Sequence, residues 1–434
     1  MIALIKLGGL LLAVVLTSAI RVPVAYVLLG GSLAVAFLFI PLPDILGVFG
    51  DILKNWETWR YAVTLWGVLL LESTMRKTGM MDELTEAAKK LFFDQRYSTA
   101  LLPSIIGFMP SIGGAYFSAP LVEKASAGLG MTQSGKAFVN YWFRHIWENS
   151  IPLYPGILMS ASITGFSIGT IMMIQFPLTI VGAVTGFIFG FWRIPPIKIR
   201  SGKFLVRLVG FLKTSWAIIT AILLVLVLPI DPSIVIFVVA LSLLFQRIWM
   251  PYIRERGKES NITPSNEVSF EADEESIIPP SPFENAKAQT WDIIKDSFKV
   301  KYFILLISAV VFKELLFAGG AMGQLKDWFD TTGLNPVVVA SVLPFFIGML
   351  VGLTPGFIGV SFPILIAISG TESYGIFALA YVSGILGVLF SPVHVCLILT
   401  GEYFKCTLFD VYRKMVLPSM IQMMAGFALW ILWS

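Results

Sequence analysis

The chain has 434 residues, of which 56% are hydrophobic and only 13% are charged. A soluble globular protein carries about a quarter of charged residues, so the composition excludes an ordinary soluble domain. The net charge of +4 is small, and in a membrane its distribution among the loops matters more than its total. Apolar runs of about 20 residues recur along the chain and predict an all-α polytopic membrane protein.

Residues 1–195 are assigned to a first transmembrane repeat. Its first apolar run, 2–20, predicts a membrane helix and not a secretory signal, because no small-residue cleavage site follows it. A second run spans 22–42, and the segment 44–57 after it carries three acids against one lysine. That acidic excess favours the external side of the membrane.

Residues 98–128 are apolar but interrupted by the stretch GFMPSIGGAYFSAP, and charged segments lie on both sides. Glycine and proline weaken a helix interior, so a spanning helix gains nothing from them. The pattern predicts a re-entrant helical hairpin whose tip exposes backbone N–H and C=O groups that can hold an ion. The alternative is that these glycines only allow close helix packing.

A broken helix is predicted over 138–163, within VNYWFRHIWENSIPLYPG. Arg144, His145 and Glu148 lie there inside an apolar segment, and ionisable groups in a membrane usually face a cavity or a partner. The spacing of Arg144 and Glu148 is compatible with an ion pair on one helical face. Two alternatives stay open: Arg144 and Glu148 only neutralise each other's charge, or the Arg144 side chain reaches the cytoplasmic interface.

Residues 196–253 are expected to form a basic junction and the first two helices of a second repeat. The junction is rich in lysine and arginine and has no acids, which places it in the cytoplasm. Residues 254–301 are rich in serine, proline and acids, and they predict a solvated cytoplasmic linker. Both termini are then expected outside the cell.

The remaining residues, 302–434, are expected to complete the second repeat. A shift of about 240 residues aligns breakers of the two halves in order, for example Gly107 with Gly348 and Pro152 with Pro392. The aligned features predict a second hairpin at 342–369 and a second broken helix at 376–400. Five crossings per half make the halves inverted relative to each other, giving about ten transmembrane helices plus two hairpins.

The hairpin tips and helix breaks contribute the residues that we predict to bind substrate. They are Ser111, Gly113, Gly114, Tyr116, Ser118, Arg144, Asn149, Thr354, Gly356, Ser361 and Ser391. His145, Glu148 and His394 are the candidates for ion or proton coupling, and the alternative for His394 is a ring satisfied by a backbone carbonyl. Metal binding is left open by the sequence.

Three stretches, GGAYFSAP, ENSIPLYPG and SPVHVCLILTGEYFK, resemble the ion transporter superfamily of secondary transporters. The resemblance covers essentially the whole chain and is closest to an uncharacterised archaeal and bacterial integral membrane family within that superfamily. It implies that hairpin tips and unwound helix centres form the substrate and ion sites. The Ser-Asn-Thr signature of divalent-anion symporters is absent from both tips, so the resemblance implies transport but names no substrate.

The expected function is secondary active transport of a small, carboxylate-type anion by alternating access, coupled to ions or protons. The alternative is a cation/proton antiporter without an organic substrate. An enzyme is not expected, because no H-E-x-x-H zinc-protease motif and no nucleotide-binding loop occur. We expect a multi-pass protein of the cell membrane with no cofactor except Na⁺ or H⁺ as coupling ion. Its expected partners are lipid and its substrate, not nucleic acid, and a homodimer is compatible with the sequence.

Overall fold

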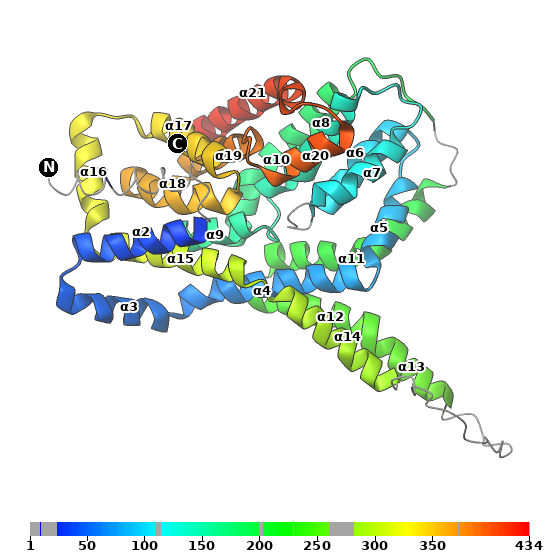
Figure 1. The fold of residues 1–434 in the computed structure, drawn as a ribbon, viewed down its shortest axis with the longest axis horizontal. Helices are drawn as coiled ribbons and strands as arrows, with labels where there is room; N and C mark the ends of the chain where they lie inside the picture. Colours follow the sequence, from blue (N-terminus) through cyan, green and yellow to red (C-terminus); the bar gives the residue numbers. More distant parts are fainter. Residues whose placement is uncertain are drawn as a thin grey trace.

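The computed structural model describes residue 9 and residues 24–108, 114–198, 203–228, 230–259, 282–370 and 373–433. Within these ranges the regular structure is helical, apart from one isolated β-bridge between Asp94 and Lys198. The predicted all-α class is therefore confirmed for the described part of the chain (Figure 1).

Four helices in the described ranges are both long and apolar enough to cross a membrane. They are α10 (Ile168–Gly190), α11 (Phe204–Val227), the continuous helix Pro232–Arg254 that begins with α12 (Pro232–Leu244), and α21 (Leu408–Trp433). Several shorter apolar helices accompany them. These helices support a membrane-embedded protein, and the number of crossings stays a prediction.

The order of helices along the chain occurs twice. The first series is α3 (Ile45–Lys54), α4 (Trp56–Lys77), α5 (Met80–Lys89), α6 (Gln95–Gly107), α7 (Gly114–Ala125), α8 (Gln133–His145), α9 (Pro155–Thr164) and α10. The second series is α14 (Pro282–Ser297), α15 (Val300–Ala318), α16 (Ala321–Thr332), α17 (Pro336–Val351), α18 (Thr354–Ser369), α19 (Tyr374–Leu389), α20 (Val395–Phe404) and α21. From α5 to α10, each helix begins 240 or 241 residues before its counterpart. The helix boundaries thus follow the spacing that the sequence comparison suggests.

Close helix contacts recur at equivalent positions of the two series. A Cβ atom on Gly107 of α6 would clash with the backbone oxygen of Arg144 in α8. A Cβ atom on Gly348 of α17 would clash in the same way with the backbone oxygen of Gly384 in α19. Only glycine lets a helix approach another backbone so closely. The helix pairs α6–α8 and α17–α19 therefore pack through the same kind of contact, a glycine against a backbone oxygen.

This packing predicts a stability effect. Gly107→Ala and Gly348→Ala should each destabilise the protein by about 1–3 kcal/mol, because a clash with backbone cannot be relieved by a rotamer change. The matched control is Gly210→Ala in α11, where a new Cβ would meet no atom within 4 Å. We expect that control to be neutral or slightly stabilising, since alanine favours a helix. Thermal unfolding in detergent measures all three, and equal stabilities would contradict the close approach.

The segment 254–301 is only partly the solvated linker that the sequence predicts. Residues 260–281 lie outside the described residues; before them α13 (Met250–Glu259) continues the helix of α12, and after them α14 forms a helix that contacts α13 (Figure 1). The helix α14 buries Ala286 and Ile293, seven residues apart on one face, and packs against α4. The buried apolar face of α14 has few residues, and the surrounding sequence is acidic. The composition therefore predicts a linker where the structure has a helix.

Charged contacts attach α14 to the end of α4. Asp296 accepts a 2.7 Å hydrogen bond from Ser73 and pairs with Arg76, and Lys77 pairs with Asp292. Burial raises the pKa of Asp296, but the Ser73 hydrogen bond and the neighbouring cations outweigh burial and hold that pKa below its ordinary value. The carboxylate therefore stabilises this contact at neutral pH, and its contribution is lost when the pH falls through the lowered pKa.

Candidate functional site

Both predicted broken helices are interrupted in the structure. The helix α8 ends at His145, a 3₁₀ turn follows at Ile146–Asn149, and α9 begins with Pro155 in its first turn. The helix α19 ends at Leu389, and α20 begins at Val395. Proline has no N–H to continue a helix but fits its first turn, which is why the chain restarts there in the first break. The two breaks interrupt the helical hydrogen-bond pattern in the middle of apolar segments.

The second hairpin turns at Gly352, between α17 and α18. Gly352 has a φ of +66°, in the left-handed region that glycine adopts without strain. A Cβ atom there would lie 2.9 Å from Ser391 Oγ and 3.2 Å from the backbone nitrogen of His394. This turn is therefore packed directly against the break between α19 and α20.

The start of α18 also contacts the break between α8 and α9. Thr354 donates a hydrogen bond to the carboxylate of Glu148, and a Cβ atom on Gly156 would lie only 2.6 Å from Thr354 Cγ2. The hydroxyl of Tyr381 in α19 donates to the backbone oxygen of Glu148 over 2.8 Å. Segments more than 200 residues apart in the chain thus meet around one glutamate.

The first hairpin reaches the same region through the end of α6. Arg144 donates from its guanidinium to the backbone oxygen of Ile106 over 3.2 Å, and the hydroxyl of Tyr154 donates to that of Gly107. The last carbonyls of a helix have no partner within the helix, so these two donors satisfy the end of α6. Residues 109–113, the tip that follows, lie outside the described residues.

A cavity of about 110 Å³ lies where these segments meet. It is lined by Arg144, His145, Glu148, Tyr154, Pro155, Gly156, Tyr302, Gly352, Leu353, Thr354, Pro355, Val388, His394, Val395 and Cys396. Among these lining residues Glu148 is the single acid and Arg144 the single residue with a permanent positive charge. A cavity with both charges and two imidazoles can hold an ion and exchange protons.

The two histidines lie side by side, with ring centroids 4.9 Å apart. In each ring Nδ1 faces a backbone oxygen, that of Tyr141 at 2.6 Å for His145 and that of Val388 at 3.2 Å for His394. Because a carbonyl only accepts hydrogen bonds, Nδ1 carries the proton in both rings, and Nε2 of the neutral ring has the lone pair. His145 Nε2 lies 3.8 Å from a carboxylate oxygen of Glu148. The carbonyl partner expected as the alternative for His394 is thus present, and the ring still lines the cavity.

The structure brings only part of the predicted site into the cavity. Arg144, His145, Glu148, Thr354 and His394 line it. Other predicted residues are buried and do not line it: Ser118, Asn149, Gly356, Ser361 and Ser391. Ser111 and Gly113 lie outside the described residues; Gly114 begins α7, and the side chain of Tyr116 is outside the described part.

Ten lining residues are not among the site residues predicted from the sequence; they include Tyr154, Tyr302 and, above all, Cys396. Cys396 lies two residues after His394 at the start of α20, and a His-x-Cys spacing was the signal that could have indicated it. Tyrosines in apolar segments carry no such signal, because they also serve as ordinary core residues.

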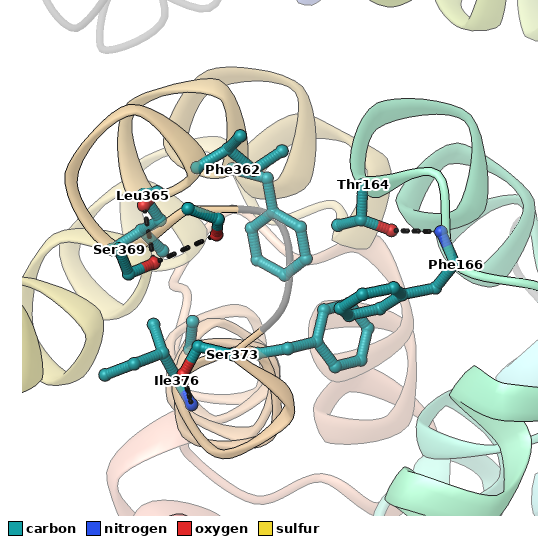
Figure 2. Close-up of a pocket in the computed structure, with 11 residues that line it drawn as sticks. Thr164, Phe166, Phe362, Leu365, Ser369, Ser373 and Ile376 are labelled. Carbon is teal, nitrogen blue, oxygen red and sulfur yellow. Dashed lines mark hydrogen bonds between the residues drawn. The ribbon is translucent and has the colours of Figure 1, made fainter. Parts of the chain in front are cut away.

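A second pocket, between the ends of α9 and α18 and the start of α19, has a different character (Figure 2). The rings of Phe166, Phe362 and Phe377 pack there with centroids 5.4–5.5 Å apart. Its hydroxyls are used within the protein, since Ser369 donates to Leu365 O and Thr164 accepts from a backbone N–H. No ionisable side chain lines it among the described residues, so the cavity at Glu148 is the candidate site.

The search of curated proteins gives no match for the chain. The comparison with protein families gives one, to the family described as "Protein of unknown function (DUF401)", over residues 4–260 and 275–432. The match covers both helix series and every described residue that lines the cavity. This family match also agrees with the expectation that the chain belongs to an uncharacterised family. The chain belongs to the DUF401 family.

Proposed function

We propose that the chain is a secondary active transporter of a small, carboxylate-type anion, coupled to protons or sodium by alternating access. One observation carries the proposal: two helix breaks and one helix turn meet in a single cavity that contains Arg144 and Glu148. Irregular backbone at membrane depth is tolerated where protein or a hydrated cavity satisfies it. Transporters use such breaks to bind substrate and to open alternately to either side.

In this mechanism the positive charge of Arg144 pairs with the anion. The backbone dipoles of the turn at Gly352, between α17 and α18, also face the anion. Glu148, His145 and His394 take up and release the coupling proton. The hydrogen bond from Thr354 links the protonation of Glu148 to the position of α18, since a protonated carboxyl accepts that bond less strongly. A change in charge at Glu148 would thereby shift the hairpin α17–α18 relative to α8–α9.

We also propose that the two helix series are inverted repeats of the ion transporter superfamily. Contacts between the halves are reciprocal: α4 of the first packs against α12, whereas α15 of the second packs against α2 (Val24–Phe39). The pairs α7–α20 and α9–α18 exchange in the same way. Reciprocal contacts are what a two-fold axis between the halves produces. The basic junction and the odd number of crossings per half favour an axis in the membrane plane.

The alternative, a cation/proton antiporter, is favoured by the size of the cavity. Its volume of about 110 Å³ is below the roughly 300–1,000 Å³ of most organic-ligand pockets. Three of the residues that line it, His145, Glu148 and His394, can exchange protons. A site that admits only an inorganic cation needs no larger space.

Proteoliposomes containing the full chain distinguish the two functions. We expect a proton or sodium gradient to drive accumulation of at least one small carboxylate inside the vesicles. If no carboxylate accumulates but added Na⁺ or K⁺ releases a preformed proton gradient, the antiporter function replaces the first proposal. If neither carboxylates nor protons move, transport itself is rejected.

A further inference from the structure

We propose that the chain binds one transition-metal ion of the zinc class through His145, His394 and Cys396. These three side chains are buried, and their ligand atoms all lie within 4.8 Å of one another. They come from the end of α8 and from the start of α20, so the two breaks bring them together. The inference goes beyond the proposed transport function, with which it shares His145 and His394, and its test does not require transport.

The spacing of the three atoms is close to that of a metal centre. Zinc binds imidazole nitrogen at about 2.0–2.1 Å and thiolate sulfur at about 2.3 Å in a tetrahedron, which sets ligand atoms roughly 3.3–3.8 Å apart. The observed upper limit of 4.8 Å needs a contraction of about 1 Å. Because the ligands sit at helix ends beside breaks, small side-chain rotations can supply it.

The orientation of both imidazoles supports the same conclusion. Each ring directs Nδ1 to a backbone carbonyl, of Tyr141 or of Val388. Metal-binding histidines commonly donate their second ring N–H to a carbonyl or carboxylate, which fixes the tautomer and leaves the other nitrogen to the metal. Here that nitrogen is Nε2 in both rings, so the ligands are oriented before any metal arrives.

Glu148 lies beside the cluster, next to one of its three ligands. One of its carboxylate oxygens lies 3.8 Å from His145 Nε2, while the other accepts from Thr354. A thiolate and a carboxylate together neutralise a dication, which matters because an uncompensated charge is costly in a buried site. Arg144 lines the same cavity, so the loaded centre and its surroundings retain one positive charge.

The donor set selects the class of metal. Sulfur and imidazole nitrogen suit zinc, copper and related transition metals, whereas sodium, magnesium and calcium prefer oxygen ligands. The cluster is therefore a different site from one for a sodium coupling ion. Without a metal, the same three groups would only form a thiol–imidazole hydrogen-bond network, and the experiments below separate the two states.

Cobalt(II) titration of the purified full-length protein provides the first test. We expect one Co²⁺ per chain, visible bands of a tetrahedral centre, and a near-ultraviolet thiolate-to-cobalt charge-transfer band that Zn²⁺ abolishes by displacement. Cys396→Ser should remove the charge-transfer band, and His394→Ala should weaken binding at least about 100-fold, more than the loss of a supporting contact. Cys406→Ser is the matched control, since this second cysteine is only partly buried and lies outside the cluster, and it should leave the band unchanged.

X-ray absorption at the zinc edge tests the site without any substitution. The wild-type protein loaded with one equivalent of Zn²⁺ should show one sulfur at about 2.3 Å and two imidazole nitrogens at about 2.0 Å. Zinc surrounded by oxygen alone would overturn the proposal. So would a cobalt charge-transfer band that survives Cys396→Ser or disappears in Cys406→Ser.

Discussion

Glu148→Gln is expected to reduce coupled transport by tenfold to a hundredfold and to flatten its dependence on pH. Glu148 is the single acid among the described residues that line the cavity, so no other described lining residue offers a carboxylate to replace it. The substitution also exchanges a charged acceptor of the Thr354 hydrogen bond for a neutral one. Hydrogen bonds to charged groups contribute about 1.5–3 kcal/mol, which corresponds to that range of rates.

The measurement is initial uptake into proteoliposomes across a range of pH and sodium concentrations. Glu86→Gln is the matched control, because Glu86 is an exposed glutamate whose surface ion pair with Lys89 contributes little free energy, and it should transport normally. Thr354→Val keeps the carboxylate of Glu148 but removes the hydrogen bond to it. We therefore expect an intermediate loss of transport rate with a retained pH dependence. A Glu148→Gln protein that transports at the normal rate with the normal pH profile would show that Glu148 only has a structural role.

Arg144→Gln should reduce the uptake of anions about 100-fold or more. The Arg144 side chain is 3% exposed and reaches the end of α6 through Ile106. Removing one member of a buried charge interaction costs about 2–5 kcal/mol, so an anion bound against this guanidinium loses most of its affinity. Arg144→Lys keeps the charge but lacks the planar fork of donors, and only partial activity is expected.

The control for Arg144 is Arg247→Gln, which removes a partly exposed arginine paired with Glu83. Thermal unfolding of each variant shows whether lost uptake reflects lost structure. A folded Arg144→Gln protein that still exchanges cations for protons would favour the antiporter function. A folded variant that still accumulates the anion would remove Arg144 from the substrate site.

The sequence by itself determined the class of the protein and the places where its helices break. Gly352 and Pro155 act through their own backbone: one adopts a left-handed turn, and the other fits the first turn of a helix. Such effects are local, so they can be located without knowledge of neighbours. The repeat spacing of about 240 residues was also visible, because the same breakers recur in the same order.

Only the tertiary structure decided which of these local features meet. The contact of Thr354 with Glu148 and the cluster of His145, His394 and Cys396 join residues more than 200 positions apart. The His-x-Cys spacing is a weak signal for Cys396, and it says nothing of His145; nothing local distinguishes the buried face of α14 from its acidic surroundings. Such contacts depend on how complete helices pack, and that packing is set by many small apolar contacts distributed over the chain.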